Sequence, residues 1–288
     1  AYSRGGHGTI NICQSLMESC NDVLMQLGAD LGKRKFLQYV NEFGFGKKTG
    51  IDLPGEATGG VFTNDTMHAV ELATSSFGQG QTVTMIQMAA AFSSVINGGN
   101  YYEPHVVKEV KSENGAVLES NDNALVRRVI TENTSKKLRK YLYKTVEEGT
   151  ALPAKVAGYQ IGGKTGTAEK HPTGRGNYLV SFIGFATKDN PEVMIYVTID
   201  EPHVADQAHS TYATQFSSEV LKEVLPVLGM YQDSSTKKAD KTKASDIKLP
   251  STKEAPDGGY SDGTYSVAGD QTDRTDTANT ASPVPSAE

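Results

Sequence analysis

The sequence predicts an α+β fold in which helices pack against an antiparallel sheet. Four helical patterns occur before residue 149, and three strand patterns follow at residues 160–169, 178–186 and 193–200. The connections between these strands are too short to hold a crossover helix, so neighbouring strands are expected to run antiparallel. Helices and a sheet bury their apolar surfaces by packing on each other, which gives this fold class.

Four helices are expected before the strands, at residues 9–31, 33–42, 84–96 and 131–148. The first of them breaks near residues 19–21. Thr131 suits the N-cap of the last one, and Gly149 suits its C-terminal end. That last helix would turn four apolar side chains toward the core: Leu138, Tyr141, Leu142 and Val146.

A surface hairpin is expected between the third and fourth helices. It would join residues 106–110 to 116–118 through the turn Glu113-Asn114-Gly115, a turn sequence that suits a hairpin. After the strands, helical spacing predicts a final helix at residues 212–225. Its apolar side would consist of Phe216, Val220, Val224 and Leu225.

The folded part is expected to span residues 1–231, followed by a disordered tail at residues 232–288. The tail consists mainly of Lys, Asp, Ser, Thr, Gly and Pro. Such a composition buries too little apolar surface to offset a chain entropy of about 1–2 kcal/mol per residue.

Composition excludes several classes of function. The net charge is −6 and no long basic run occurs, which argues against a nucleic-acid partner. No stretch approaches the ~20 apolar residues of a membrane-spanning helix. The spacing His203-x-x-Asp206-x-x-His209 fits no established metal motif, and we interpret these residues as polar side chains on the surface. Neither a metal nor a cofactor is expected.

Cys13 and Cys20 both fall within the first helical stretch. Seven residues are two helical turns, or roughly 10 Å in an unbroken helix. That separation is too long for a disulfide bond, so both are interpreted as small buried hydrophobic residues.

The sharpest motif is the run Gly162-Gly163-Lys164-Thr165-Gly166-Thr167-Ala168 in the first predicted strand. Strand geometry places Lys164 and Gly166 on one face and Thr165 and Thr167 on the other. A glycine within a strand lets a ligand or another segment approach the backbone closely. Taken alone, the motif fits a solvated lysine on an edge strand as well as it fits a catalytic lysine.

A second motif, Ser19-Cys20-Asn21, falls at the helix break. A Ser-x-Asn triplet is weak by itself, since a serine that caps a helix explains most of them. Ser112-Glu113-Asn114 has the same pattern, but it lies in the predicted hairpin turn, where turn formation accounts for it. Only its combination with Lys164 and the surrounding sequence gives Ser19 functional weight.

Together with the sequence around them, these motifs resemble the transpeptidase domain of class B penicillin-binding proteins from about His7 to Met230. Ser-x-Asn and Lys-Thr-Gly are two of the three motifs of such serine acyl-transferases. The matching stretches are residues 7–8, 19–21, 43–46, 49–56, 77–80, 97–99, 104, 148–151, 163–168 and 181–186. The resemblance implies the fold shared by penicillin-binding proteins and serine β-lactamases, incomplete at its N-terminal side.

The resemblance also implies a peptidoglycan D,D-transpeptidase that forms cell-wall cross-links through a serine acyl-enzyme. Its partners would be peptidoglycan stem peptides, β-lactams and other cell-wall synthesis proteins, in elongation, division or sporulation. The third motif, Ser-x-x-Lys, does not precede Ser19 in this chain. We therefore expect the nucleophile to lie outside it, the chain alone to be inactive, and the full-length protein to sit on the extracytoplasmic face of the bacterial membrane through an N-terminal anchor.

The family's site residues carry over onto six positions. Ser19 and Lys164 would pass a proton to the leaving D-Ala amine, and Asn21 would hold a substrate amide. The hydroxyls of Thr165 and Thr167 would bind the terminal carboxylate together with the Lys164 charge. The backbone N–H of Thr167 would form half of the oxyanion hole, and Gly166 would complete the substrate-binding strand.

Two other functions stay open on the sequence. A serine β-lactamase shares these motifs, although no Glu-x-x-Leu-Asn lies between Ser19 and Lys164. A penicillin sensor or an assembly scaffold would need no activity at all. Because the family takes two strands and the serine-bearing helix from upstream sequence, we also expect exposed inner faces on the three strands and on residues 84–96, and hence poor solubility.

Overall fold

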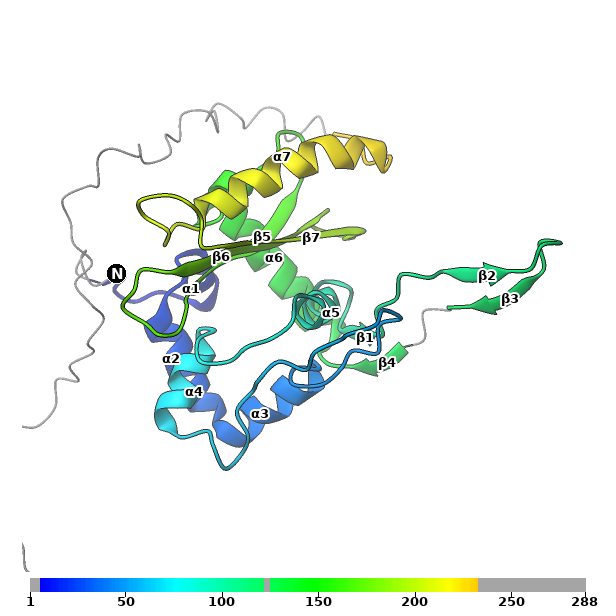
Figure 1. The fold of residues 1–288 in the computed structure, drawn as a ribbon. Helices are drawn as coiled ribbons and strands as arrows, with labels where there is room; N and C mark the ends of the chain where they lie inside the picture. The colour runs from blue at the N-terminus through cyan, green and yellow to red at the C-terminus, as the bar shows by residue number, and fades with distance from the viewer. Residues whose placement is uncertain (1–5, 122–124, 233–288) are drawn as a thin grey trace, which may run out of the picture. The chain divides into compact units, whose positions relative to one another are not determined.

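The computed structural model describes residues 6–121 and 125–232, so nearly all of the expected tail lies outside the described residues. Its sheet has the order β5-β6-β7, with antiparallel neighbours (Figure 1). The strands are β5 (Ile161–Glu169), β6 (Tyr178–Ala186) and β7 (Val193–Asp200). This arrangement confirms the predicted α+β class and all three predicted strands.

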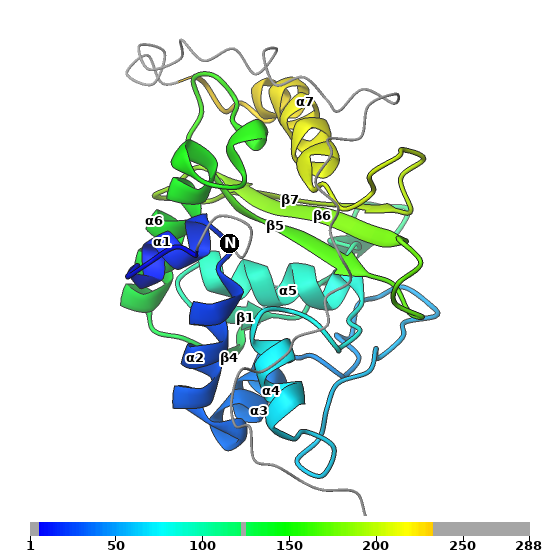
Figure 2. The ribbon, with the colours of Figure 1, turned by 90° about the vertical axis from the view of Figure 1, so that its left-hand side faces the viewer.

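Helices cover both faces of this sheet. In Figures 1 and 2, α7 (Thr211–Val227) lies on one face, and α5 (Met85–Ile96) and α6 (Glu132–Glu148) lie on the other. Alternate residues of β6 serve the two layers: Phe182 packs in the cluster with α7, and Phe185 packs in the cluster with α5. Lys164 pairs with Ile183 in the neighbouring strand, so its side chain belongs to the face covered by α5 and α6.

The N-terminal part forms α1 (Ile12–Met17), α2 (Asn21–Leu31) and α3 (Lys33–Glu42). The first two confirm the predicted helix with its break, and the third has its predicted bounds. A further helix, α4 (Ala69–Ser76), is absent from the sequence-based expectations. It packs closely on α2 because Gly28 has no side chain, and a Cβ there would lie 1.8 Å from Ser76 Oγ.

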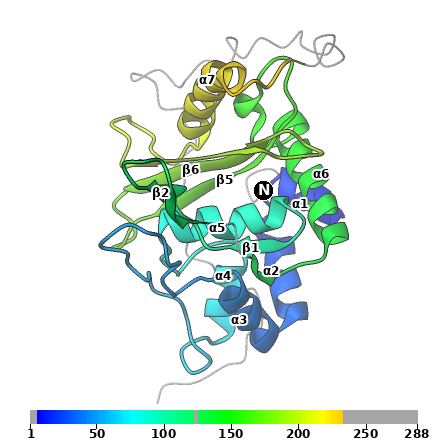
Figure 3. The same ribbon diagram turned by 90° about the vertical axis from the view of Figure 1, so that its right-hand side faces the viewer.

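Four short strands lie between α5 and α6 in the chain. Figure 3 shows α3 and α4 on the side of α5 away from the sheet. The predicted hairpin is present as β2 (Glu109–Lys111) and β3 (Val117–Ser120). The pair β1 (Asn100–Tyr102) and β4 (Leu125–Arg128) was not expected. Strands of three or four residues carry too little alternation to be recognised from sequence.

The buried side of α7 agrees with the predicted one only in part. Leu225 is fully buried as predicted, whereas Phe216 and Val224 are 54% and 38% exposed. The other buried positions include Ala213, Ser217 and Leu221, which together with Leu225 form a row spaced four residues apart on one side of the helix. The prediction found this row only at Leu225, because two of its members are small residues.

The expected exposure of the inner faces is also wrong for most positions. Phe92 and Ile183 are 9% and 8% exposed, and Phe185 is fully buried, because α5 packs directly on the sheet. Of that helix's large side chains, Met85 at its N-terminus is exposed. Cys20 is buried and Cys13 is half-buried, and both are free thiols, as expected.

A short loop and the 3₁₀ turn η2 (Leu152–Ala154) connect α6 to β5. Gly162 lets the helix and strand approach: a Cβ there would lie 3.1 Å from the backbone nitrogen of Tyr143 and 2.4 Å from the Phe185 ring. At this contact the buried hydroxyl of Thr145 donates to the carbonyl of Gly163. This hydrogen bond ties α6 to the strand one residue before Lys164.

We expect Thr145→Val to lower the free energy of unfolding by about 1–3 kcal/mol, because valine keeps the shape but leaves the buried Gly163 carbonyl without its donor. Urea denaturation measures the change. Thr134→Val, at an exposed position in the first turn of the same helix, is the control and should change stability by less than about 0.5 kcal/mol. Equal losses at the two positions would contradict this assignment.

Candidate active site

Ser19 lies in the break between α1 and α2. Its φ of 50° is in the left-handed region, which is uncommon for residues other than glycine. The turn is held by the Ser19 N–H, which donates to Leu16 C=O at 3.3 Å, and by the Cys20 N–H, which donates to Ser15 C=O at 2.8 Å. Strained backbone of this kind persists where the surrounding structure holds it, often at functional sites.

The side chain of Lys164 brings the sheet and this helix break together. Its Nζ donates to Ser19 Oγ at 2.9 Å, to the carbonyl of Thr165 at 2.9 Å, and to Thr165 Oγ1 at 3.4 Å. An ammonium has three N–H donors, so these contacts use all of them. Two residues that are 145 positions apart in the sequence (164 − 19) are thus in direct contact.

Burial lowers the pKa of Lys164 from 10.5 to about 8. The cause is the removal of the charged form from water, which disfavours an ammonium. A group with a pKa near the working pH can both give and accept a proton, which is what general acid–base catalysis requires. Lys164 is therefore suited to proton transfer through the Ser19 hydroxyl.

The register of β5 shows which of its backbone groups are directed away from β6. The N–H of Lys170 donates to Asn177 C=O at 2.8 Å, continuing the ladder past the pair Glu169 and Tyr178. Hydrogen-bonded pairs alternate along an antiparallel ladder, so even-numbered residues of β5 bond to β6. The N–H and C=O groups of odd-numbered residues point to the opposite edge, which we call the open edge of β5.

Side-chain donors on the open edge agree with this register. The carbonyl of Gly163 accepts from Thr145 Oγ1, that of Thr165 accepts from Lys164 Nζ at 2.9 Å, and that of Thr167 accepts from Gln79 Nε2 at 3.1 Å. The N–H of Thr167 points to the same edge as its carbonyl. It therefore lies on the edge where the Lys164 ammonium and Ser19 are found.

The other expected site residues are close in sequence to Ser19 or Lys164, but their surroundings differ. Asn21 is the exposed first residue of α2, two positions after Ser19. Thr167 is exposed, and Thr165 Oγ1 lies 3.4 Å from Thr150 Oγ1. Gly166 has a packing reason, since a Cβ there would lie 2.5 Å from Ser181 Oγ in the next strand.

The sequence analysis did not single out two residues of this site. Thr150 contacts Thr165 from the loop after α6, and Gln79 contacts Thr167 from the loop after α4. Both fall within stretches that carry the family resemblance, at residues 148–151 and 77–80. No local pattern distinguished them, because their roles depend on contacts across 15 and 88 positions.

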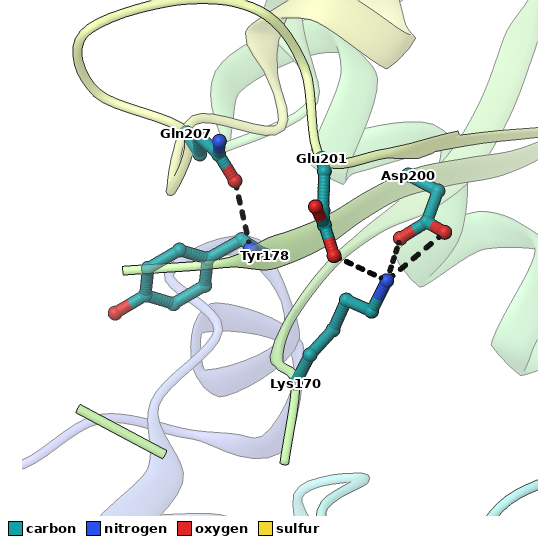
Figure 4. Close-up of polar contacts among 5 residues, drawn as sticks. All are labelled: Lys170, Tyr178, Asp200, Glu201 and Gln207. Carbon is teal, nitrogen blue, oxygen red and sulfur yellow. Dashed lines mark hydrogen bonds and ion pairs between the residues drawn. The ribbon is translucent and has the colours of Figure 1, made fainter. Parts of the chain in front are cut away.

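Beyond Glu169, an ion-pair cluster holds the loops at the outer end of the sheet together. In Figure 4 the ammonium of Lys170 lies between the carboxylates of Asp200 and Glu201, at 2.9 Å and 2.6 Å. Gln207 accepts a hydrogen bond from the Tyr178 N–H at 3.0 Å. These contacts join the loop that follows β7 to the hairpin between β5 and β6.

Other kinds of site find little support in the described part of the chain. No group of three or more His, Cys, Asp and Glu residues there could hold a metal, and His209 Nε2 lies 2.8 Å from Asp206 Oδ2. The helices in the same ranges are too short or too polar to cross a bilayer. A surface depression of about 430 Å³ lies along α6 and Lys188, and none of the expected site residues lines it.

Comparison with known proteins gives a consistent result. A family model described as the penicillin-binding protein transpeptidase domain matches residues 1–224. Stage V sporulation protein D of Bacillus subtilis (strain 168) is 42% identical over 233 residues, which cover 80% of this chain and 36% of that protein. A probable peptidoglycan D,D-transpeptidase, PenA of Neisseria flavescens, is 29% identical over 84% of this chain and 58% of that protein.

Solved structures agree. Penicillin-binding protein 3 of Mycobacterium tuberculosis, complexed with ampicillin, superimposes with a TM-score of 0.71 at 26% identity, over 78% of this chain and 52% of that one. The similarity confirms the fold that the sequence implied. The chain spans between about a third and somewhat over half of the length of these relatives.

We expect an NMR titration of the lysine 13Cε signals to give Lys164 an apparent pKa near 8. Lys170 is the control, because its hydrogen bonds to Glu201 and Asp200 raise its pKa. The charged form of Lys164 is the one that burial destabilises, so this residue's contribution to stability should improve as the pH rises from about 8 to 10.5. A Lys164 signal that titrates together with Lys170 would contradict the burial argument.

Proposed function

The chain belongs to the family of penicillin-binding protein transpeptidase domains, and from this premise we propose that it supplies the proton-transfer and carboxylate-binding part of a peptidoglycan D,D-transpeptidase site. The observation that carries the proposal is the 2.9 Å hydrogen bond from Lys164 to Ser19. It joins two family motifs around a lysine whose pKa of about 8 suits proton transfer.

The proposed reaction places the nucleophilic serine outside these 288 residues. Its oxygen attacks the penultimate D-Ala carbonyl of a stem peptide, and its proton passes to its lysine partner. The C–N bond to the terminal D-Ala then breaks, and Ser19, with Lys164 behind it, gives a proton to the leaving amine. An amine from a second stem peptide next attacks the acyl-enzyme carbonyl, the ester C–O bond breaks, and the proton that the amine loses returns to the serine oxygen as the cross-link forms.

The open edge of β5 supports the remaining roles. The Thr167 N–H would donate to the developing oxyanion, and loss of one such donor typically costs about 10²–10³ in rate. The Lys164 charge and the hydroxyls of Thr165 and Thr167 would bind the terminal carboxylate, since charge-assisted hydrogen bonds are the strong ones. Asn21 would hold a substrate amide, and Gly166 would keep the strand close to its neighbour.

The similarity to a penicillin-binding protein solved with ampicillin supports β-lactams as ligands of this site. A penicillin would enter as a mimic of the stem peptide and acylate the serine. The cell-wall roles of the relatives support an extracytoplasmic location for the complete protein, an N-terminal membrane anchor outside these residues, and other cell-wall synthesis proteins as partners.

We expect Ser19→Ala and Lys164→Ala to slow acylation of the full-length protein by a fluorescent penicillin by about 10²–10⁴, the range of general acid–base catalysis. The matched control is Ser112→Ala, which removes the serine of the other Ser-x-Asn triplet. That serine bonds within its own turn, so the rate should not change. Normal acylation of both site variants would overturn the assigned roles.

Residues 1–288 alone should show no covalent labelling by the same penicillin, because the proposed nucleophile lies elsewhere. Gel fluorescence after denaturation measures this, with the full-length protein as the positive control. A stable adduct on the short chain would rule out this placement of the serine. An adduct of the full-length protein that turns over within seconds would instead identify a β-lactamase.

A further inference from the structure

Three of the outward carbonyls of β5, those of Gly163, Thr165 and Thr167, accept side-chain hydrogen bonds from different kinds of donor. Thr145, which donates to Gly163, is buried on α6, and Lys164, which donates to Thr165, is shielded from water on the strand itself. The third donor, Gln79, comes from a loop, and its 3.1 Å contact with the Thr167 carbonyl is exposed. Of these hydrogen bonds, the one from Gln79 is therefore the most open to exchange with a ligand.

The loop around Gln79 is built for a local bend. Gly78 and Gly80 on either side have φ values of 93° and 85°, a region that other residues rarely adopt. No atom lies within 4 Å of the position of a Cβ at Gly78, so the loop is open beside that residue. The contact with the Thr167 carbonyl is made by the end of the Gln79 side chain at an exposed position, so rotation of this side chain is the motion that would release the carbonyl.

A ligand that uses the Thr167 N–H also faces the Thr167 carbonyl. An extended chain that lies antiparallel along a free strand edge exchanges both hydrogen bonds with the residue opposite. In an acyl donor bound in this way, the carbonyl oxygen accepts a hydrogen bond from the Thr167 N–H. If the donor also has an amide N–H, that group is directed to the Thr167 carbonyl oxygen. Gln79 Nε2 occupies that acceptor in this structure.

We propose that Gln79 is a specificity-determining residue that takes the place of the ligand's amide on the Thr167 carbonyl and is displaced by acyl donors that carry this amide. The inference rests on the proposed function, since it requires acyl donors to bind along β5. An acyl donor that carries the amide replaces the hydrogen bond from Gln79 to the Thr167 carbonyl by one from its own amide, and both bonds are neutral. Donors without it leave the Gln79 contact in place.

The test compares acylation of the full-length protein by a penicillin that has an acylamino side chain and by a β-lactam that has none. Gln79→Ala should raise the second-order acylation rate of the first by about threefold to tenfold, the net worth of one neutral hydrogen bond. The rate of the second should not change. Gln79→Glu keeps the size but cannot donate when ionised, so it should act in the same direction.

The control is Gln81→Ala in the same loop, which should leave both rates unchanged, and a thermal melt checks that each variant is folded. The proposal is overturned if Gln79→Ala slows acylation or leaves it unchanged for the acylamino compound. Slower acylation would mean that Gln79 supports the strand. Unchanged acylation would mean that the Thr167 carbonyl accepts hydrogen bonds from Gln79 and from the ligand at the same time. A change of equal size for both compounds would also overturn it.

A second measurement does not depend on acylation. On titration with an N-acylated D-Ala-D-Ala dipeptide, the NMR signals of the Gln79 side-chain amide should move toward those of a solvated glutamine, while those of Gln81 stay in place. Unmoved Gln79 signals at saturating peptide would overturn the inference. A wild-type protein that releases Gln79 but is never acylated would refute the proposed function alone.

Discussion

The buried ammonium of Lys164 is the interaction on which the rest of this structure depends. A charge withdrawn from water is costly unless hydrogen bonds replace its hydration. Here those bonds come from the Ser19 hydroxyl and from the Thr165 residue beside it. Because Ser19 belongs to a helix break and Lys164 to the sheet, the helical part and the sheet must meet correctly before the charge can be tolerated. The same contact therefore ties the site to the fold and offsets part of the cost of burying the charge.

Glycine makes that meeting possible for reasons that differ along β5. At Gly162 and Gly163, neighbouring aromatic rings and α6 occupy the space of a side chain, which lets Thr145 reach the strand. At Gly166 the space is taken by Ser181 from β6. The glycines around Lys164 thus leave room for neighbouring side chains and for α6. The backbone groups of the odd-numbered residues remain directed to the open edge.

Much of this could be predicted from the sequence. Long elements with a clear period were found with nearly their observed bounds, and the resemblance located Ser19 and Lys164 although nothing local connects them. What failed has physical causes. The helix α4 and the pair β1 and β4 are short and depend on tertiary contacts, and the buried side of α7 includes small residues, such as Ala213 and Ser217, that a search for hydrophobic positions overlooks. Gln79 and Thr150 acquire their contacts only when distant segments meet.

The left-handed backbone at Ser19 has a consequence for how this site can vary. Threonine also carries a hydroxyl, but its branched side chain is poorly compatible with a positive φ. Glycine accepts the backbone but has no hydroxyl. The positive φ disfavours threonine, and the need for a hydroxyl excludes glycine. Serine satisfies both requirements. Substitutions should therefore be tolerated less at this position than at its neighbours.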